Sequence, residues 1–201
     1  MIAFDENDGQ LTLTINRPEK ANALTERMLG EMTDIITETD ARVLVLTGVG
    51  NVFSAGADLD DVRDGTLATS PEWERLSTAV ANFVGLSISA INGACVGGAL
   101  GMVLACDLRI SVPKAKFFYP VIKMGVLPQP SDPVRLRDLI GPSATKLILL
   151  TGTQITAVEA LTLGLINRIS PLNLMSDVQV MTAPARAADP AQIWAIKALI
   201  K

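Results

Sequence analysis

The chain has 201 residues, of which 49% are hydrophobic and 4% aromatic, and it carries a net charge of −4 with no histidine. This length suits one compact domain whose core needs no disulfide bonds. The 17 basic residues are scattered singly, which argues against a nucleic-acid-binding surface. The absence of histidine excludes Ser-His-Asp and Cys-His nucleophile activation, so any proton transfer must use a carboxylate, a tyrosine, a lysine or water.

The two cysteines, Cys95 and Cys106, lie in apolar surroundings without metal-binding spacing, and we expect small buried side chains and no metal site. The N-terminal segment MIAFDENDGQ is acidic and has no basic stretch before an apolar run, which predicts a cytoplasmic protein. Residues 76–106 carry no charge, but Asn82 and an Asn92-Gly93 turn interrupt them, so no membrane span is expected. The high hydrophobic content favours burial of apolar surface by self-association.

The first elements follow a strand, helix, strand order. Residues 11–15 (LTLTI) alternate like a half-buried strand, and apolar residues between 24 and 36 recur at helical spacing behind Thr25, a possible N-cap. Residues 42–47 (RVLVLT) predict a strand buried on both faces. This order indicates helices layered on a sheet.

The middle of the chain repeats this alternation. Ser70-Pro71 opens a helix whose apolar face consists of Trp73, Leu76, Val80, Phe83 and Val84. Residues 86–91 (LSISAI) predict the next strand, and the glycine-rich segment 91–107 turns the chain back into a helix.

The remaining elements are short. Residues 108–111 and 115–119 predict strands, and a helix starts at Ser131 or Asp132 and is closed by Gly141. Thr156 and Glu159 predict a capping box, with a helix that stops at Gly164. Asp189-Pro190 starts the last helix, whereas residues 172–188 are weakly patterned and fit a loose helical tail.

Two small-residue segments, 54–58 (SAGAD) and 97–99 (GGA), each follow a predicted strand. Glycine lets a ligand approach the backbone closely, and the first amides of a helix favour an anion. One alternative is that Gly97, Gly98 and Gly101 only permit close packing of helix and strand. A dinucleotide fingerprint and a Walker loop are both absent. As a pair, the two segments predict amides that converge on one oxygen atom.

Five segments resemble the enoyl-CoA hydratase/isomerase (crotonase) superfamily. They are LTINRPEKANALTERM, VFSAGADLDDV, AINGACVGGALGMVLACDLRIS, AKFFYPVIKMGVLP and LTGTQITAVEALTLGLINRI. The resemblance implies an α/β crotonase-like spiral of β-β-α turns, with a core domain at 1–170 and a shortened C-terminal helical segment at 171–201. It also implies an acyl-CoA thioester ligand, no cofactor beyond CoA, a lyase or isomerase of fatty acid metabolism, and a homotrimer or dimer of trimers.

The resemblance assigns roles to individual residues. The backbone amides of Ala57 and Gly98 would form an oxyanion hole for the thioester oxygen. The substrate-binding residues that it implies are Lys20, Ala21, Ala23, Ala55, Asp58, Leu59, Val96, Gly97, Pro120 and Val121. Two alternatives stay open, since Lys20 fits a solvated loop charge and Asp58 fits an Asx cap of the following helix.

The sequence departs from the family at its two hydratase glutamates, because Gly101 and Val121 stand in their positions. We therefore expect ordinary hydration to be very slow. The candidate replacements are Gln129, Tyr119 and Asp132, although Tyr119 also fits a strand anchor and Asp132 a helix cap.

Asp60, Asp61 and Asp64 lie near enough in sequence to reach the acyl pocket, and they also fit a solvated helix start. The expected function is acyl-CoA binding with stabilisation of a thioester enolate. The alternatives are a non-catalytic acyl-CoA binding or carrier protein, and an acyl-CoA decarboxylase or hydrolase.

Overall fold

The computed structural model describes residues 1–63 and 67–200, so Asp64 lies outside the described residues. The strands are β1 (Ile2–Asn7), β2 (Gln10–Ile15), β3 (Val43–Gly48), β4 (Val52–Ser54), β5 (Leu86–Ile91), β6 (Ala94–Val96), β7 (Leu108–Ser111), β8 (Lys116–Phe118), β9 (Ile155–Thr156) and β10 (Arg168–Ile169). The α-helices are α1 (Glu26–Glu38), α2 (Leu59–Arg63), α3 (Glu72–Asn82), α4 (Ala99–Ala105), α5 (Val121–Met124), α6 (Asp132–Thr151), α7 (Ala157–Leu163), α8 (Leu174–Ala187) and α9 (Pro190–Ile200). Two 3-10 turns, Pro18–Lys20 and Leu67–Thr69, complete the described elements.

The strands form two sheets. The larger sheet has the order β1-β2-β3-β5-β7-β10, and the smaller has the order β4-β6-β8-β9. Neighbouring strands are parallel except in the β1-β2 and β8-β9 pairs. A strand of the larger sheet is followed by a short strand of the smaller sheet and then by helix, in β3-β4-α2, β5-β6-α4 and β7-β8-α5. This repetition confirms the predicted spiral of β-β-α turns.

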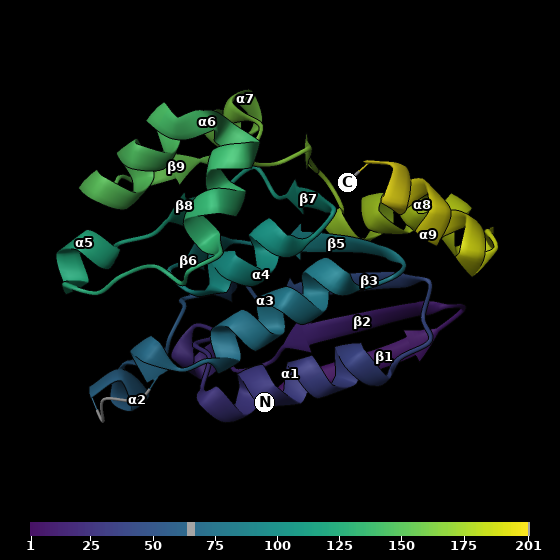
Figure 1. Ribbon diagram of the computed structural model, residues 1–201, viewed down its shortest axis with the longest axis horizontal. Coiled ribbons are helices and arrows are strands. Elements are labelled where there is room, and N and C mark those ends of the chain that lie inside the picture. The colour runs from purple at the N-terminus through teal and green to yellow at the C-terminus, as the bar shows by residue number, and fades with distance from the viewer. Residues whose placement is uncertain (64–66, 201) are drawn as a thin grey trace.

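Helices cover both faces of the larger sheet (Figure 1). Along β3, Val43 and Val45 pack with Val178 of α8, whereas Leu44 and Leu46 belong to the core that contains α1, α3 and α4. Successive residues of a strand point to opposite faces, so an unbroken apolar run needs a helix layer on each side. The prediction of a strand buried on both faces is confirmed.

Several predicted helix boundaries are confirmed. The Thr25 side chain accepts a hydrogen bond from the Met28 amide at the start of α1, and Thr156 and Glu159 form the capping box of α7. Gly164 ends α7 with φ of 85°. Gly141 breaks the predicted helix with φ of 76°, a conformation that glycine adopts without steric cost, and a second helical stretch then continues to Thr151.

Other expectations were incomplete or wrong. Strand β1 was not predicted, because it is an exposed edge strand in which only Ile2 is buried. Val84 does not belong to the buried face of α3, since it follows the end of that helix and is 57% exposed. The loose tail expected at 172–188 contains the regular helix α8, whose Leu174 and Val178 pack on the larger sheet.

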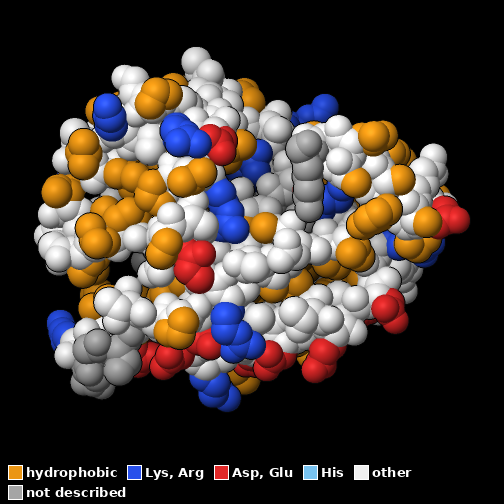
Figure 2. Space-filling view, viewed as in Figure 1, with side chains coloured by type: hydrophobic (Ala, Val, Ile, Leu, Met, Phe, Trp, Pro, Cys, Tyr) orange, Lys and Arg blue, Asp and Glu red, His pale blue; other side chains and the backbone are white. Residues whose placement is uncertain are grey.

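The surface carries much apolar area. Figure 2 shows hydrophobic side chains gathered over α5 and α6 and over the C-terminal helices. In α9, Trp194 is 59% exposed and Leu199 is 87% exposed. None of the helices within 1–63 and 67–200 is long and apolar enough to cross a membrane. Cys95 and Cys106 are free and buried, as predicted.

Candidate active site

The two small-residue segments meet at one cavity of about 190 Å³. Ala57 comes from the turn after β4, and Gly98 comes from the turn after β6. Because β4 and β6 are adjacent parallel strands, the turns at their carboxyl ends lie side by side. The cavity is lined by Ala55, Gly56, Ala57, Leu59, Val62, Ala68, Trp73, Val96, Gly97, Gly98, Tyr119, Pro120, Val121, Met124, Val126, Leu127 and Gln129.

The backbone N–H of Ala57 points away from Leu24, its partner in a parallel β-bridge. Leu24 donates to Gly56 O at 2.8 Å and accepts from the Asp58 amide at 2.9 Å, which leaves Ala57 between two used groups. In this parallel pairing the N–H of the middle residue points to the opposite side. Within the described residues, the Ala57 amide donates no hydrogen bond.

The Gly98 amide has a similar position at the start of α4. Gly97 has φ of +56° and donates to Phe118 O at 3.0 Å, and the described residues offer the Gly98 amide no acceptor. Gly56 has φ of +88°, and a Cβ there would lie 2.7 Å from Val96 O. Glycine at position 56 therefore lets the two turns approach closely, and Ala57 and Gly98 line the same cavity.

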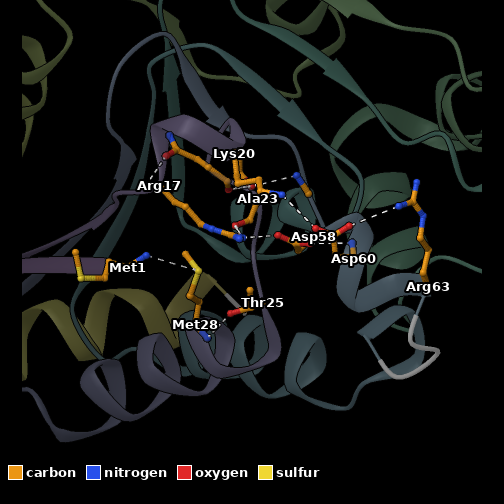
Figure 3. Close-up of polar contacts among 12 residues, drawn as sticks. Met1, Arg17, Lys20, Ala23, Thr25, Met28, Asp58, Asp60 and Arg63 are labelled. Atoms are coloured by element: carbon orange, nitrogen blue, oxygen red, sulfur yellow. Dashed lines mark hydrogen bonds and ion pairs between the residues drawn. The ribbon is translucent and has the colours of Figure 1, made fainter.

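A buried polar network fixes the first of these turns (Figure 3). Arg17 donates to Asp58 and to Ala23 O, and the Asp60 amide donates to the other oxygen of Asp58. Burial raises the pKa of Asp58, but these hydrogen bonds outweigh it and keep the pKa below its ordinary value. Asp58 is thus an Asx cap, as the open alternative held, and also an anchor for the turn.

Asn22 ties the same turn to the sheet. Its φ is +57° and its side chain is fully buried. The side-chain amide donates to Val49 O and Val52 O, and the side-chain oxygen accepts from the Arg17 amide. Sequence analysis assigned no role to Arg17 or Asn22, although both belong to the NRPEKANAL segment that it quoted.

The residues implied for CoA binding divide into two groups. Ala55, Leu59, Val96, Gly97, Pro120 and Val121 line the cavity, whereas Lys20, Ala21, Ala23 and Asp58 do not. The Ala21 carbonyl oxygen accepts a hydrogen bond from the Ala55 amide at 3.0 Å, so Ala21 supports the cavity wall from behind. The half-exposed side chain of Lys20 pairs with Asp60 at 3.1 Å (Figure 3).

Trp73 of α3 forms the wall behind Gly98. Its indole N–H donates to Leu67 O at 2.8 Å, which fixes the ring. A Cβ at Gly98 would lie 3.0 Å from this ring. Trp73 was predicted as part of a helix face and not as a site residue; its chain position gave no signal that it would face the cavity.

The polar side chains of the cavity are Tyr119 and Gln129, apart from the indole N–H of Trp73. Among the described lining residues none carries a carboxylate or an amine. The Tyr119 hydroxyl donates to Asp132 Oδ2 at 2.8 Å and accepts from the backbone N–H of Gln129 at 3.4 Å. Asp132 is 1% exposed and lies behind Tyr119, so Tyr119, Gln129 and Asp132 form one group.

The position of Gly101 explains why Asp132 fits there. A Cβ at Gly101 would lie 2.9 Å from Asp132 Oδ1 and 3.2 Å from Oδ2. The Asp132 carboxyl therefore occupies the space that a side chain at position 101 would need. This carboxyl bonds to Tyr119 and not to a helix amide, so it does not cap α6.

The family model described as "Enoyl-CoA hydratase/isomerase" matches residues 5–199. The chain belongs to the enoyl-CoA hydratase/isomerase family. It is 34% identical over 211 residues to the probable enoyl-CoA hydratase echA6 of Mycobacterium leprae, covering 100% of this chain and 82% of that protein. It is 33% identical to the 2,3-dehydroadipyl-CoA hydratase of Escherichia coli, covering 88% of this chain and 72% of that protein.

The fold is shared with solved structures. Pseudomonas aeruginosa DspI superimposes with a TM-score of 0.92 at 31% identity, covering 99% of this chain and 85% of that one. This likeness confirms the predicted crotonase-like α/β fold.

Proposed function

We propose that this family member binds an acyl-CoA thioester and stabilises its enolate with the backbone amides of Ala57 and Gly98. The observation that carries the proposal is that Ala57 and Gly98 line one cavity and that, within the described residues, their backbone amides donate to no other group. Donors that are already oriented and shielded from water stabilise a developing oxyanion most strongly. The Arg17–Asp58 pair and the hydrogen bonds of Asn22 support the turn that carries the Ala57 amide.

The CoA portion would extend from the cavity mouth over Ala55 and Leu59. Both residues are exposed, and both line the cavity. The CoA phosphates would compete with Asp60 for Lys20, whose exposed ion pair is weak enough to exchange. Ala21, Ala23 and Asp58 would act indirectly, by fixing the backbone of Ala55 and Ala57.

Ordinary hydration of an enoyl-CoA is expected to be slow. Hydration needs a positioned acid or base, and such a group typically contributes about 100- to 10,000-fold. Gly101 has no side chain, and Val121 gives the cavity an apolar wall. Decarboxylation of a malonyl-type thioester fits these residues better, since it needs enolate stabilisation but no base to remove a proton.

A second candidate is a non-catalytic acyl-CoA binding or carrier protein. The lack of a carboxylate among the described lining residues favours it. A third candidate is hydrolysis of the thioester, in which Gln129 would orient the attacking water.

The decisive experiment compares Gly98→Pro with Gly98→Ala. Both variants add a Cβ that contacts Trp73, but only proline removes the amide N–H. Binding of CoA esters is measured by calorimetry, and turnover is measured with enoyl-, malonyl- and hydroxyacyl-CoAs. Gly98→Pro should lose about 100- to 1,000-fold in turnover relative to Gly98→Ala. Circular dichroism checks that α4 is intact in both.

Each outcome has a distinct meaning. Tight binding of an ester without turnover of any supports the carrier function. Rapid hydration of crotonyl-CoA contradicts the role assigned to Gly101 and Val121. Absence of binding to every CoA ester refutes the proposed function itself.

The proposal extends to assembly as a homotrimer or a dimer of trimers in the cytoplasm. It is supported by the apolar surface of α9, where Leu199 and Ile200 are 87% and 80% exposed. Contiguous exposed apolar area on a soluble domain marks an interaction surface. Sedimentation velocity would give the mass, and a monomer at all concentrations contradicts this part.

A further inference from the structure

A buried acid lies behind the only phenol of the chain. Asp132 Oδ2 accepts the Tyr119 hydroxyl at 2.8 Å, and both side chains are at least 97% buried, with exposed fractions of 1% and 3%. Asp132 Oδ1 is buried and has no hydrogen-bond partner among the described residues. A purely structural carboxyl would normally have both oxygens satisfied, since an unpaired buried oxygen is costly.

The surroundings of this carboxyl keep it close to the cavity. Oδ1 faces Gly101, and the missing side chain there leaves room for the carboxyl. Tyr119 separates Asp132 from the cavity and lines the same cavity as Ala57 and Gly98. Among the described hydrogen bonds, that of the Tyr119 hydroxyl links Asp132 to the cavity.

We propose that Tyr119 and Asp132 form a proton relay at the α-carbon of the bound thioester, with Tyr119 as the catalytic residue and Asp132 as its positioning residue. This inference rests on the proposed function, because the relay acts on the enolate held by Ala57 and Gly98. The relay deepens that function by naming the groups that move the proton.

The relay runs in two directions. To form the enolate, the phenolic proton of Tyr119 passes to Asp132 as the phenolic oxygen takes the α-proton, and the electron pair of the broken C–H bond moves onto the thioester oxygen. To quench an enolate, including one left when CO2 departs from a malonyl-type ester, the Asp132 proton passes to Tyr119 as the Tyr119 proton bonds to the α-carbon. Asp132 then exchanges with water through the Tyr119 hydroxyl: it releases its proton after an enolate has formed and takes one up after an enolate has been quenched.

The protonation equilibria suit this exchange. Burial, with the adjacent Asp132, raises the pKa of Tyr119 above its usual range, so the phenol alone is no base at neutral pH. Burial raises the pKa of Asp132 to about 7, and the hydrogen bond from Tyr119 offsets only part of that rise. Glu74 on α3 raises this pKa further, and Arg135 on α6 lowers it. Asp132 can then hold or release a proton near neutrality.

The test measures deuterium uptake at the α-carbon of propionyl-CoA in D2O by mass spectrometry. The wild type should exchange, at a rate that rises with pH through about 7, because the carboxylate form of Asp132 is the proton acceptor. Tyr119→Phe and Asp132→Asn should each lower the rate by about 100-fold or more. Asp138→Asn, on the exposed side of the same helix, should leave it unchanged.

Asparagine at position 132 keeps an oxygen that accepts a hydrogen bond from the Tyr119 hydroxyl, but it cannot take up the proton. The variant therefore separates a structural role of Asp132 from its role in proton transfer. A structural role predicts that Asp132→Asn keeps the exchange rate and its pH profile, and this result overturns the relay. Exchange at the wild-type rate in Tyr119→Phe also overturns it, as does a wild type that binds propionyl-CoA without any exchange. Unfolding curves show whether either variant is destabilised.

Failure of the relay is distinguishable from failure of the proposed function. No binding of propionyl-CoA by calorimetry refutes the proposed function. Decarboxylation of malonyl-CoA that depends on the Gly98 amide, without exchange of propionyl-CoA, leaves the oxyanion hole standing and refutes only the relay.

Discussion

Replacing Asp132 with asparagine should remove a pH dependence from the stability of the fold. Burial raises the pKa of Asp132 from its ordinary 3.8 to about 7. Between these two values the folded protein holds a proton that the unfolded chain has lost. The free energy of unfolding of the wild type therefore decreases as pH rises from about 4 to about 7, and it is constant with respect to this group above that range.

The size of the effect follows from the same difference. A pKa that is higher by about 3 in the folded state corresponds to about 4 kcal/mol, at roughly 1.4 kcal/mol per pH unit. The Asp132→Asn variant lacks this titration, so its stability relative to the wild type should increase by up to about 4 kcal/mol from pH 4 to pH 8. Any cost of burying the new amide group, about 1 to 3 kcal/mol, lowers the free energy of unfolding of the variant by the same amount at every pH.

Urea unfolding midpoints and slopes at several pH values give both free energies, at one protein concentration. Asp138→Asn is the matched control, because its carboxyl is on the exposed side of α6. A difference between Asp132→Asn and the wild type that stays constant between pH 4 and pH 8 would refute the reasoning. It would mean that Asp132 is ionised throughout, in contact with charge or water that the described contacts do not include.

Two further changes test the support of the site. Asp58→Ala removes the buried partner of Arg17 and should lower the free energy of unfolding by about 3 kcal/mol. Asp60→Ala, which removes an exposed ion pair with Lys20, should lower it by less than about 1 kcal/mol. Equal effects of the two changes in urea unfolding would contradict the anchoring role of Asp58. Gly101→Glu should destabilise the fold because its Cβ meets the Asp132 carboxyl at 2.9 Å, and adding Asp132→Gly should restore at least about 1 kcal/mol. Strictly additive free energies in this double-mutant cycle would show that the two positions do not interact.

Much of the fold could be predicted from local patterns. Helix ends were predictable at Thr25, Thr156 and Gly164. The two threonine side chains accept hydrogen bonds from backbone amides of the first helical turn, and Gly164 ends its helix with a positive φ. The strand at 43–48 was predictable because both of its faces are apolar. Strand β1 was not predictable in this way, because its exposed residues carry no alternation.

The part of the candidate site that lies in continuous motifs was predictable. The segments SAGAD and GGA pointed to Ala57 and Gly98, and the same motifs pointed to other residues that line the cavity, such as Leu59 and Val121. Asn22, Arg17 and Trp73 were missed because their roles depend on partners 27 or more residues away, or on a helix face turned toward the cavity.

The sequence by itself determined the family and the main alternation of strands and helices. Only the tertiary structure decided what fills the space beside Gly101. Gly101 and Asp132 are 31 residues apart, and their contact exists because α4 packs against α6. A pattern along the chain reports the backbone within a few residues, whereas the charge and hydration of a buried carboxyl depend on groups that folding brings around it.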